Sequence, residues 1–135
     1  MYEYFEHQAD VGIIGYGKTL EEAFVEGAKA MFQVMCEIKN VKAVKKIKIE
    51  VEGNDKETMF IEWLNDLLAK KDIEDMFFSE FEVKIDGNKL IGLAKGEKMD
   101  LDRHQVKVEV KAATYAQLKV EEVDKGYKVQ CVVDV

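Results

Sequence analysis

The sequence predicts an α+β protein, a single domain over residues 1–135 in which two layers form: a largely antiparallel sheet with two helices packed on one face. Two observations support this prediction. Only two segments repeat their apolar residues with helical spacing, whereas about eight short segments alternate apolar and polar residues as strands do. Two links between strands are short turns, Asp86-Gly87-Asn88 and Asp124-Lys125-Gly126, and such turns join antiparallel neighbours. A doubly wound parallel sheet is therefore excluded.

The first half of the chain supplies two strands and the first helix. "YEYFEH" and "VGIIGYG" read as short strands on either side of Ala9 and Asp10. The segment "TLEEAFVEGAKAMFQVMCEI" is a helix, because Thr19 and Glu22 form a capping box and the apolar residues that follow recur with helical spacing.

The next two elements are a strand and the second helix. "VKKIKIEVEG" places Ile47, Ile49 and Val51 on one strand face, with Lys and Glu on the other. Asn54 or Asp55 then opens a helix whose apolar pairs recur at every turn.

The remaining elements are all strands. "FEVKI" and "KLIGLAKGE" flank the first short turn, "LKVEEV" and "YKVQCVV" flank the second, and "VKVEVKA" between them predicts one further strand.

Composition limits the classes of protein to consider. The formal net charge of −7 argues against nonspecific nucleic-acid binding through the whole surface. No apolar run approaches the roughly 20 residues of a membrane span, and the N-terminus "MYEYFEHQAD" does not resemble a signal peptide, so a cytoplasmic location is expected.

Cys36 and Cys131 have no partner at metal-binding spacing and are expected to be core residues. The tract from Lys39 to Lys48 favours a solvated face over a docking surface.

"GIIGYGKT", residues 12–19, matches the phosphate-binding pattern G-x-x-x-x-G-K-[ST] letter for letter. A phosphate loop needs a buried parallel strand before it and a helix N-terminus to receive the phosphates. Here the preceding strand is not continuously apolar, and Thr19 is already used as a helix cap. We therefore interpret the match as coincidental.

Few residues suggest chemistry on their own. His7 lies near Asp10 in "HQAD", where a hydrogen-bonded histidine is favoured over a general base, and "DLDRH" up to His104 reads as a polar loop. Asp134 lies beside the terminal carboxylate of Val135, so two negative groups meet there. If Asp10 approached them, three hard oxygen donors would suit Ca²⁺ or Mg²⁺. Solvated acids are the alternative.

Three separated motifs together resemble the archease family, and the likeness covers essentially the whole chain. They are H-x-A-D-x-G-I followed by G-Y-G-x-T-L-E-E-A, the segment V-K-A-x-T-Y, and a terminal Asp with one apolar residue. Two positions depart from the family pattern: Gln8 replaces a usual Thr, and Ala116 stands where a His commonly follows T-Y.

The resemblance implies an accessory protein of the GTP-dependent RNA ligase of tRNA splicing, not an enzyme in its own right. Such a protein promotes guanylylation of the ligase, supports its multiple turnover and meets tRNA only through it. The resemblance also implies a divalent ion, commonly calcium with Mg²⁺ or Mn²⁺ as options, on Asp10, Asp134 and Val135. It further implies a partner or phosphate contact through Lys111, and His7 is a second candidate for such a contact.

Two alternatives come from other functional classes. A stand-alone metal- or nucleotide-dependent hydrolase would use Asp10, Asp134 and Lys18. A chaperone-like or general RNA-binding module would use the lysine tract.

Overall fold

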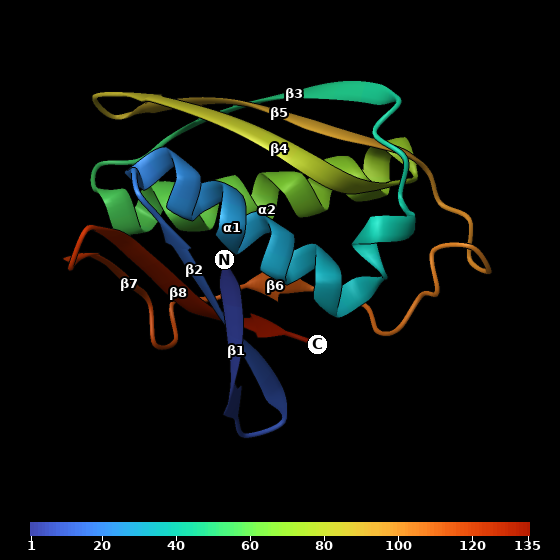
Figure 1. Cartoon of the computed structure of the whole chain (residues 1–135), viewed down its shortest axis with the longest axis horizontal. Coiled ribbons are helices and arrows are strands. Elements are labelled where there is room, and N and C mark those ends of the chain that lie inside the picture. Colours follow the sequence, from blue (N-terminus) through green and yellow to red (C-terminus); the bar gives the residue numbers. More distant parts are fainter.

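The computed structural model describes residues 1–135 and contains antiparallel sheets and two long helices, which confirms the α+β class. Figure 1 shows the helices in a middle layer with a sheet on either side of them. In chain order the elements are β1 (Tyr2–His7), β2 (Asp10–Gly17), α1 (Leu20–Met35), the short 3₁₀ helix η1 (Ile38–Asn40), β3 (Lys45–Glu52), α2 (Lys56–Glu74), β4 (Met76–Asp86), β5 (Lys89–Lys98), β6 (Ala112–Ala113), β7 (Lys119–Val123) and β8 (Gly126–Asp134).

The strands divide into two sheets, which corrects the expectation of one. The larger sheet has the order β1-β2-β8-β6, with β7 also paired to β8, and the smaller has the order β3-β5-β4. All pairs are antiparallel. Both helices contact both sheets. Alternation along a strand indicates which of its faces is buried, but it does not tell which strands share a sheet.

The buried surface of the second helix explains the second sheet. Phe60 and Ile61 are both buried, and so are Trp63 and Leu64, so apolar side chains occupy much more than one narrow stripe. A helix with so wide an apolar surface needs cover on more than one side. One sheet on each side provides that cover, and each sheet still carries helices on one of its faces, as the sequence predicted.

The helix starts follow the sequence prediction. Thr19 caps α1 by accepting a 3.1 Å hydrogen bond from the Glu22 N–H, and Asp55 caps α2 by accepting a 2.7 Å bond from the Thr58 N–H. Both predicted hairpins also form: β4 pairs with β5 around Gly87, and β7 pairs with β8 around Lys125.

The strand predicted at residues 106–112 is wrong for most of its length. Only Ala112 and Ala113 pair with β8, opposite Asp134 and Val133. Lys111 is joined to β8 only by the hydrogen bond from its N–H to the Asp134 carbonyl, and residues 106–110 pair with no strand. The Lys107 N–H instead donates to the Met35 carbonyl at the end of α1. Val106 and Val108 consequently remain exposed despite their alternation.

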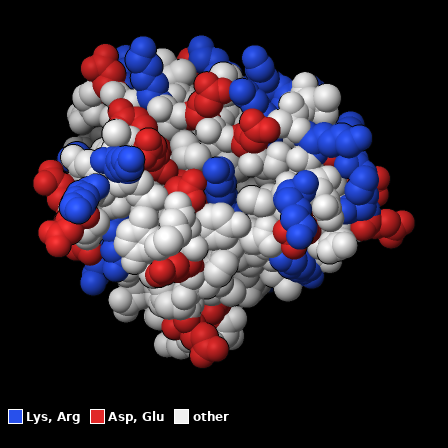
Figure 2. Space-filling model, in the orientation of Figure 1, with Lys and Arg blue, Asp and Glu red and all other residues white.

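The surface carries charges of both signs. Figure 2 shows Lys and Arg side chains interspersed with Asp and Glu over the face in view. Within the lysine tract, Lys45 pairs with Glu74 at 3.3 Å and Lys48 pairs with Glu50 at 2.7 Å. This arrangement matches the predicted solvated face.

Neither helix is long and apolar enough to span a membrane.

Candidate functional site

Asp10 and Val135 lie together at one end of the larger sheet. β2 and β8 pair antiparallel with Val11 opposite Val133, so the register places Asp10 opposite Asp134 at the next step. Residues opposite each other in antiparallel strands project to the same face of the sheet. The Val135 N–H donates a 3.2 Å hydrogen bond to Oδ1 of Asp10. The three positions that the sequence suggested for a cation therefore converge, and we call this end of the sheet the acidic tip.

No basic side chain balances the negative charge of the acidic tip. No ion pair involves Asp10, Asp134 or the terminal carboxylate of Val135. The donors are carboxylate oxygens, which are the ligands that hard divalent cations prefer. Only two of them come from side chains, and the chain contains no group of three or more His, Cys, Asp or Glu side chains arranged to hold a metal. The donor set thus fits a divalent ion only with the terminal carboxylate included.

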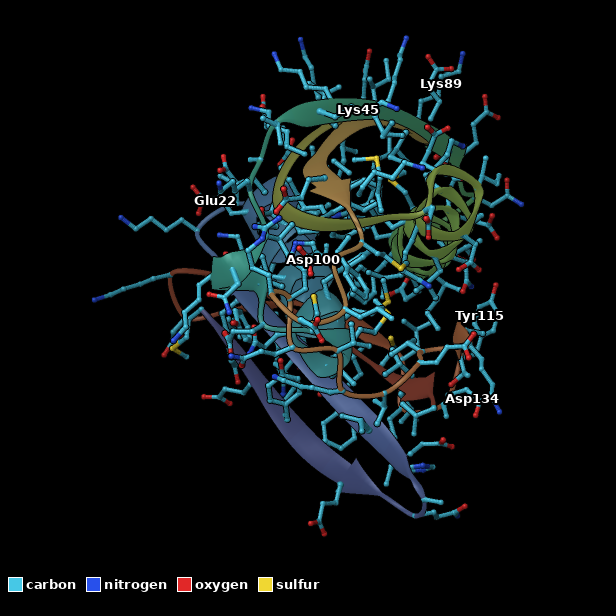
Figure 3. The ribbon with its side chains drawn as sticks, turned by 90° about the vertical axis from the view of Figure 1, so that its right-hand side faces the viewer. Glu22, Lys45, Lys89, Asp100, Tyr115 and Asp134 are labelled. Carbon is cyan, nitrogen blue, oxygen red and sulfur yellow. The ribbon has the colours of Figure 1, made fainter.

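His7 and Lys111 reach the same end of the sheet. His7 is the β1 residue paired with Asp10 across the two-residue turn at Gln8 and Ala9. Its Nδ1 is buried without a hydrogen-bond partner. The Lys111 N–H donates a 2.7 Å hydrogen bond to the Asp134 carbonyl, while its exposed side chain forms no ion pair. Figure 3 shows this side of the molecule with Asp134 and Tyr115 labelled.

The phosphate-loop match is explained by packing. Gly12 to Gly17 lie within β2, an antiparallel strand and not a loop. A Cβ on Gly12 would stand 2.3 Å from the Phe5 ring, and one on Gly15 would stand 2.5 Å from the Gly27 nitrogen. The glycines are therefore required where other groups press against the strand, and the resemblance to the nucleotide-binding pattern is coincidental.

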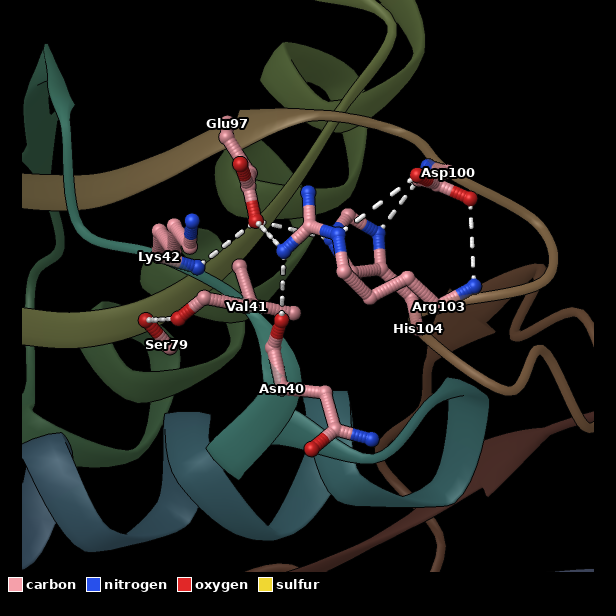
Figure 4. Close-up of polar contacts among 8 residues, drawn as sticks. All are labelled: Asn40, Val41, Lys42, Ser79, Glu97, Asp100, Arg103 and His104. Atoms are coloured by element: carbon pink, nitrogen blue, oxygen red, sulfur yellow. Dashed lines mark hydrogen bonds and ion pairs between the residues drawn. The ribbon is translucent and has the colours of Figure 1, made fainter.

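The "DLDRH" tract is more structured than a polar loop, and the sequence did not predict this. His104 is fully buried and its Nε2 lies 2.9 Å from Oε2 of Glu97. The same carboxylate oxygen accepts hydrogen bonds from Arg103 at 2.8 Å and from the Lys42 N–H at 2.7 Å (Figure 4). These hydrogen bonds, above all that from Arg103, lower the pKa of Glu97 to about 2. The Asp100 N–H donates to Nδ1 of His104, so Nε2 carries the proton.

This cluster is structural. It ties the loop after β5 to the segment after η1, and Arg103 also donates to the Asn40 carbonyl at 3.1 Å. The only signal in the sequence was the acidic and basic spacing of Asp100, Arg103 and His104, because Glu97 and Lys42 are joined only by the fold. The two cysteines, Cys36 and Cys131, are also core residues as predicted, and burial raises the pKa of each thiol to about 12.

Comparison with known proteins supports one family. A family model described as the Archease protein family matches residues 2–135. A protein archease of Pyrococcus furiosus is 45% identical over 129 residues, covering 93% of this chain and 91% of that protein. A protein archease of Sulfurisphaera tokodaii is 40% identical over 136 residues, covering 99% and 98%. The solution structure of Methanobacterium thermoautotrophicum protein 1598 superposes with a TM-score of 0.85 at 33% identity, covering 99% and 98% of the two chains.

Proposed function

The chain belongs to the archease family, whose members are accessory proteins of RNA processing, and we propose that it activates a GTP-dependent tRNA-splicing RNA ligase. In this role the protein promotes guanylylation of the ligase and its return to a second cycle. It contacts tRNA only through the ligase, and the ligase supplies the nucleophile.

The observation that supports this proposal most directly is the convergence of Asp10, Asp134 and Val135. Three carboxylates without a cationic partner repel one another, so their gathering favours a divalent cation as the missing partner. Calcium is the proposed ion, with Mg²⁺ and Mn²⁺ as alternatives. When bound, such an ion neutralises phosphate charge and orients a nucleotide for in-line attack.

Lys111 and His7 contribute groups beside these carboxylates. The Lys111 ammonium is exposed and forms no ion pair, so it is free to contact a phosphate or a carboxylate of the ligase. The unpartnered Nδ1 of His7 offers one further polar atom near Asp10. Neither residue needs to act as an acid or base in this role.

The geometry disfavours the alternative of a hydrolase built on Asp10, Asp134 and Lys18. Asp10 begins β2 and Lys18 follows its last residue, Gly17. Seven residue steps along a strand separate its ends by about 24 Å. Lys18 therefore lies far from the acidic tip and cannot share a substrate with it.

The alternative of a general RNA-binding module loses its main support. Lys45 and Lys48 of the lysine tract are paired with Glu74 and Glu50, and the net charge is −7. Salt-sensitive RNA binding by the isolated protein would favour this module instead.

A guanylylation assay of the ligase with and without this protein tests the proposed function. We expect the protein at substoichiometric amounts to raise the rate of guanylate transfer and the number of ligation cycles. An unchanged rate over a broad range of protein and GTP concentrations would rule the proposed role out.

A further inference from the structure

Tyr115 is the most exposed aromatic residue of the chain, with 61% of its surface accessible. The other exposed aromatic residue, Tyr4, is 43% accessible, and its hydroxyl donates a 2.9 Å hydrogen bond to the Ala30 carbonyl. The hydroxyl of Tyr115 has no hydrogen-bond partner within the chain. Its ring is therefore not used to build the fold.

The backbone around Tyr115 is nevertheless held firmly against β8. The Thr114 N–H and hydroxyl both donate to the Val132 carbonyl, at 2.9 and 2.8 Å. The Val132 N–H in turn donates to the Ala116 carbonyl at 3.1 Å, and the Leu118 N–H closes a turn on the Tyr115 carbonyl at 3.2 Å. Tyr115 thus sits between two residues that are both fixed to Val132.

A buried polar side chain also holds this turn. The Gln130 side chain is 7% exposed and donates a 2.8 Å hydrogen bond to the carbonyl of Gln117. Gln117 has a left-handed φ of 54°, which costs a non-glycine residue free energy. The fold thus buries an amide and strains one residue in order to fix this turn, while the largest side chain of the turn, Tyr115, remains in solvent. Such an arrangement is typical of a preorganised binding element.

The turn lies next to the acidic tip. Val132 precedes Asp134 by two residues in β8, a distance of about 7 Å along a strand. Lys111, with its free ammonium, is bonded through its backbone to Asp134 on the same side of β8. Figure 3 labels Tyr115 and Asp134 on the same side of the molecule in that view.

We propose that Tyr115 is a stacking platform for the purine base of a nucleoside triphosphate whose phosphates lie beside Lys111 and would meet the acidic tip through the divalent cation proposed there. This inference rests on the proposed function and deepens it, because it makes the protein bind the nucleotide that the ligase uses. Proteins hold bases without reading their edges by combining an aromatic face with positive charge that contacts the phosphates, and here Tyr115 and Lys111 offer those two groups.

The surroundings of the ring favour a base over a protein partner. Ala116 and Gln117, which follow Tyr115 in the turn, are exposed and either small or polar. A protein hot spot is an aromatic residue within an apolar patch that excludes water. An isolated ring beside a free lysine and three carboxylates lacks that patch.

Fluorescence of the isolated protein tests the stacking directly. In the variant Tyr115→Trp, the added indole reports a stacked base, while the native Trp63 is fully buried and gives a constant background. Val44→Trp is the matched control, because Val44 is 74% exposed and lies in the segment before β3. With Mg²⁺ present, GTP is expected to quench Tyr115→Trp, and inorganic triphosphate, which has no base, is not. Equal responses to the two ligands, or to GTP in both variants, would overturn the proposal.

The ligase assay separates a nucleotide contact from a ligase contact. With Tyr115→Leu, the GTP concentration giving half-maximal guanylylation is expected to rise by about 10-fold, as loss of one base stack implies. Tyr115→Phe should behave as wild type because it keeps the ring. If Tyr115→Leu instead raises the amount of protein needed and leaves the GTP dependence unchanged, Tyr115 contacts the ligase and the proposal is wrong. If wild type fails to stimulate the ligase while GTP still quenches Tyr115→Trp, the proposed function is rejected and the stacking site is retained.

Discussion

The side chain of Asn65 hydrogen-bonds to both backbone groups of Ala113. Its Oδ1 accepts from the Ala113 N–H at 2.8 Å, and its Nδ2 donates to the Ala113 carbonyl at 3.2 Å. The side-chain amide therefore satisfies the backbone N–H and carbonyl of Ala113 as a neighbouring strand would. This matters because β6 pairs with β8 over only two positions. Because Lys111 and Tyr115 lie two residues to either side of Ala113, this contact from α2 positions both of them.

Asn65→Ala is expected to lower the free energy of unfolding by about 2 kcal/mol, because it leaves two partly buried backbone groups without partners. It should also speed amide hydrogen exchange at residues 111–115 more than elsewhere, as local opening predicts. Glu62→Ala, an exposed change on the same helix, is the control and should shift stability by less than about 0.5 kcal/mol. Urea unfolding and exchange measured on the three proteins check both effects. Uniformly faster exchange would show that Asn65 supports the whole fold and not this segment.

Gly15→Ala is expected to destabilise the protein by about 2 kcal/mol through overpacking. The new methyl group would stand 2.5 Å from the Gly27 nitrogen and 2.7 Å from the Ala23 carbonyl oxygen, and both are backbone atoms of α1 that cannot move aside independently. Lys18→Ala, in the same phosphate-loop pattern, should be nearly neutral because that side chain is exposed. Thermal unfolding compares them. Equal stability of Gly15→Ala and wild type would mean that α1 and β2 separate at little cost.

Those parts of the fold that depend on local sequence were predictable. The caps at Thr19 and Asp55 and the turns at Gly87 and Lys125 depend on residues close together in the chain, and all of them formed. The division into two sheets was not predictable, because alternation along β3 or β8 carries no information about lateral neighbours. The strand at Val106 and Val108 failed for the same reason, since a strand needs a partner that its own sequence does not specify.

Some features of the candidate site were also predictable from the sequence and others were not. The resemblance placed Asp10, Asp134 and Val135 together, and the register of β2 and β8 accounts for their proximity. The chemical pattern alone left them as possible solvated acids. The hydrogen bonds between Asn65 and Ala113 and between Gln130 and Gln117 were not predicted, because each joins residues more than ten positions apart in the sequence.

The hydrogen-bonded Glu97 predicts how stability changes in acid. Its pKa falls from an ordinary 4.5 to about 2 in the folded chain, chiefly through the hydrogen bond from Arg103. A carboxyl group whose folded pKa is lowered contributes stability that is fully present above the unfolded pKa and is lost as the pH falls towards the folded pKa. The contribution of Glu97 should therefore be complete above about pH 5 and disappear between about pH 4.5 and pH 2.

Glu97→Gln checks this contribution, because glutamine keeps the shape but not the charge. Urea unfolding at several pH values should show the variant less stable than wild type at pH 7, with the gap narrowing as the pH falls below 4.5. Glu80→Gln, an exposed change on β4, is a control for general charge effects. A gap that stays constant from pH 7 to pH 2.5 would locate the effect in packing and not in ionisation.

The proposed cation site makes the most demanding prediction, because it needs the Val135 carboxylate as well as two side chains. Asp10→Asn is the most informative change: it keeps an oxygen for the Val135 N–H, which donates at 3.2 Å in wild type, but removes the charge. Calcium affinity should fall at least 10-fold, since a hard cation prefers anionic oxygen ligands. Asp134→Asn should do the same. Asp86→Ala, in the turn of the other sheet, removes one charge elsewhere and should leave calcium binding unchanged.

Adding two residues after Val135 tests the third ligand. The extension converts a charged carboxylate into a neutral amide carbonyl and carries the new chain end away from Asp10, so calcium affinity should fall as it does in Asp10→Asn. Titration calorimetry measures the affinity, and urea unfolding shows whether each variant remains folded. Loss of binding in the two Asn variants but not in the extended chain would confine the site to side chains and remove Val135 from it. Wild-type affinity in all three would mean that the acidic tip is not a calcium site, and activation of the ligase would then need another explanation.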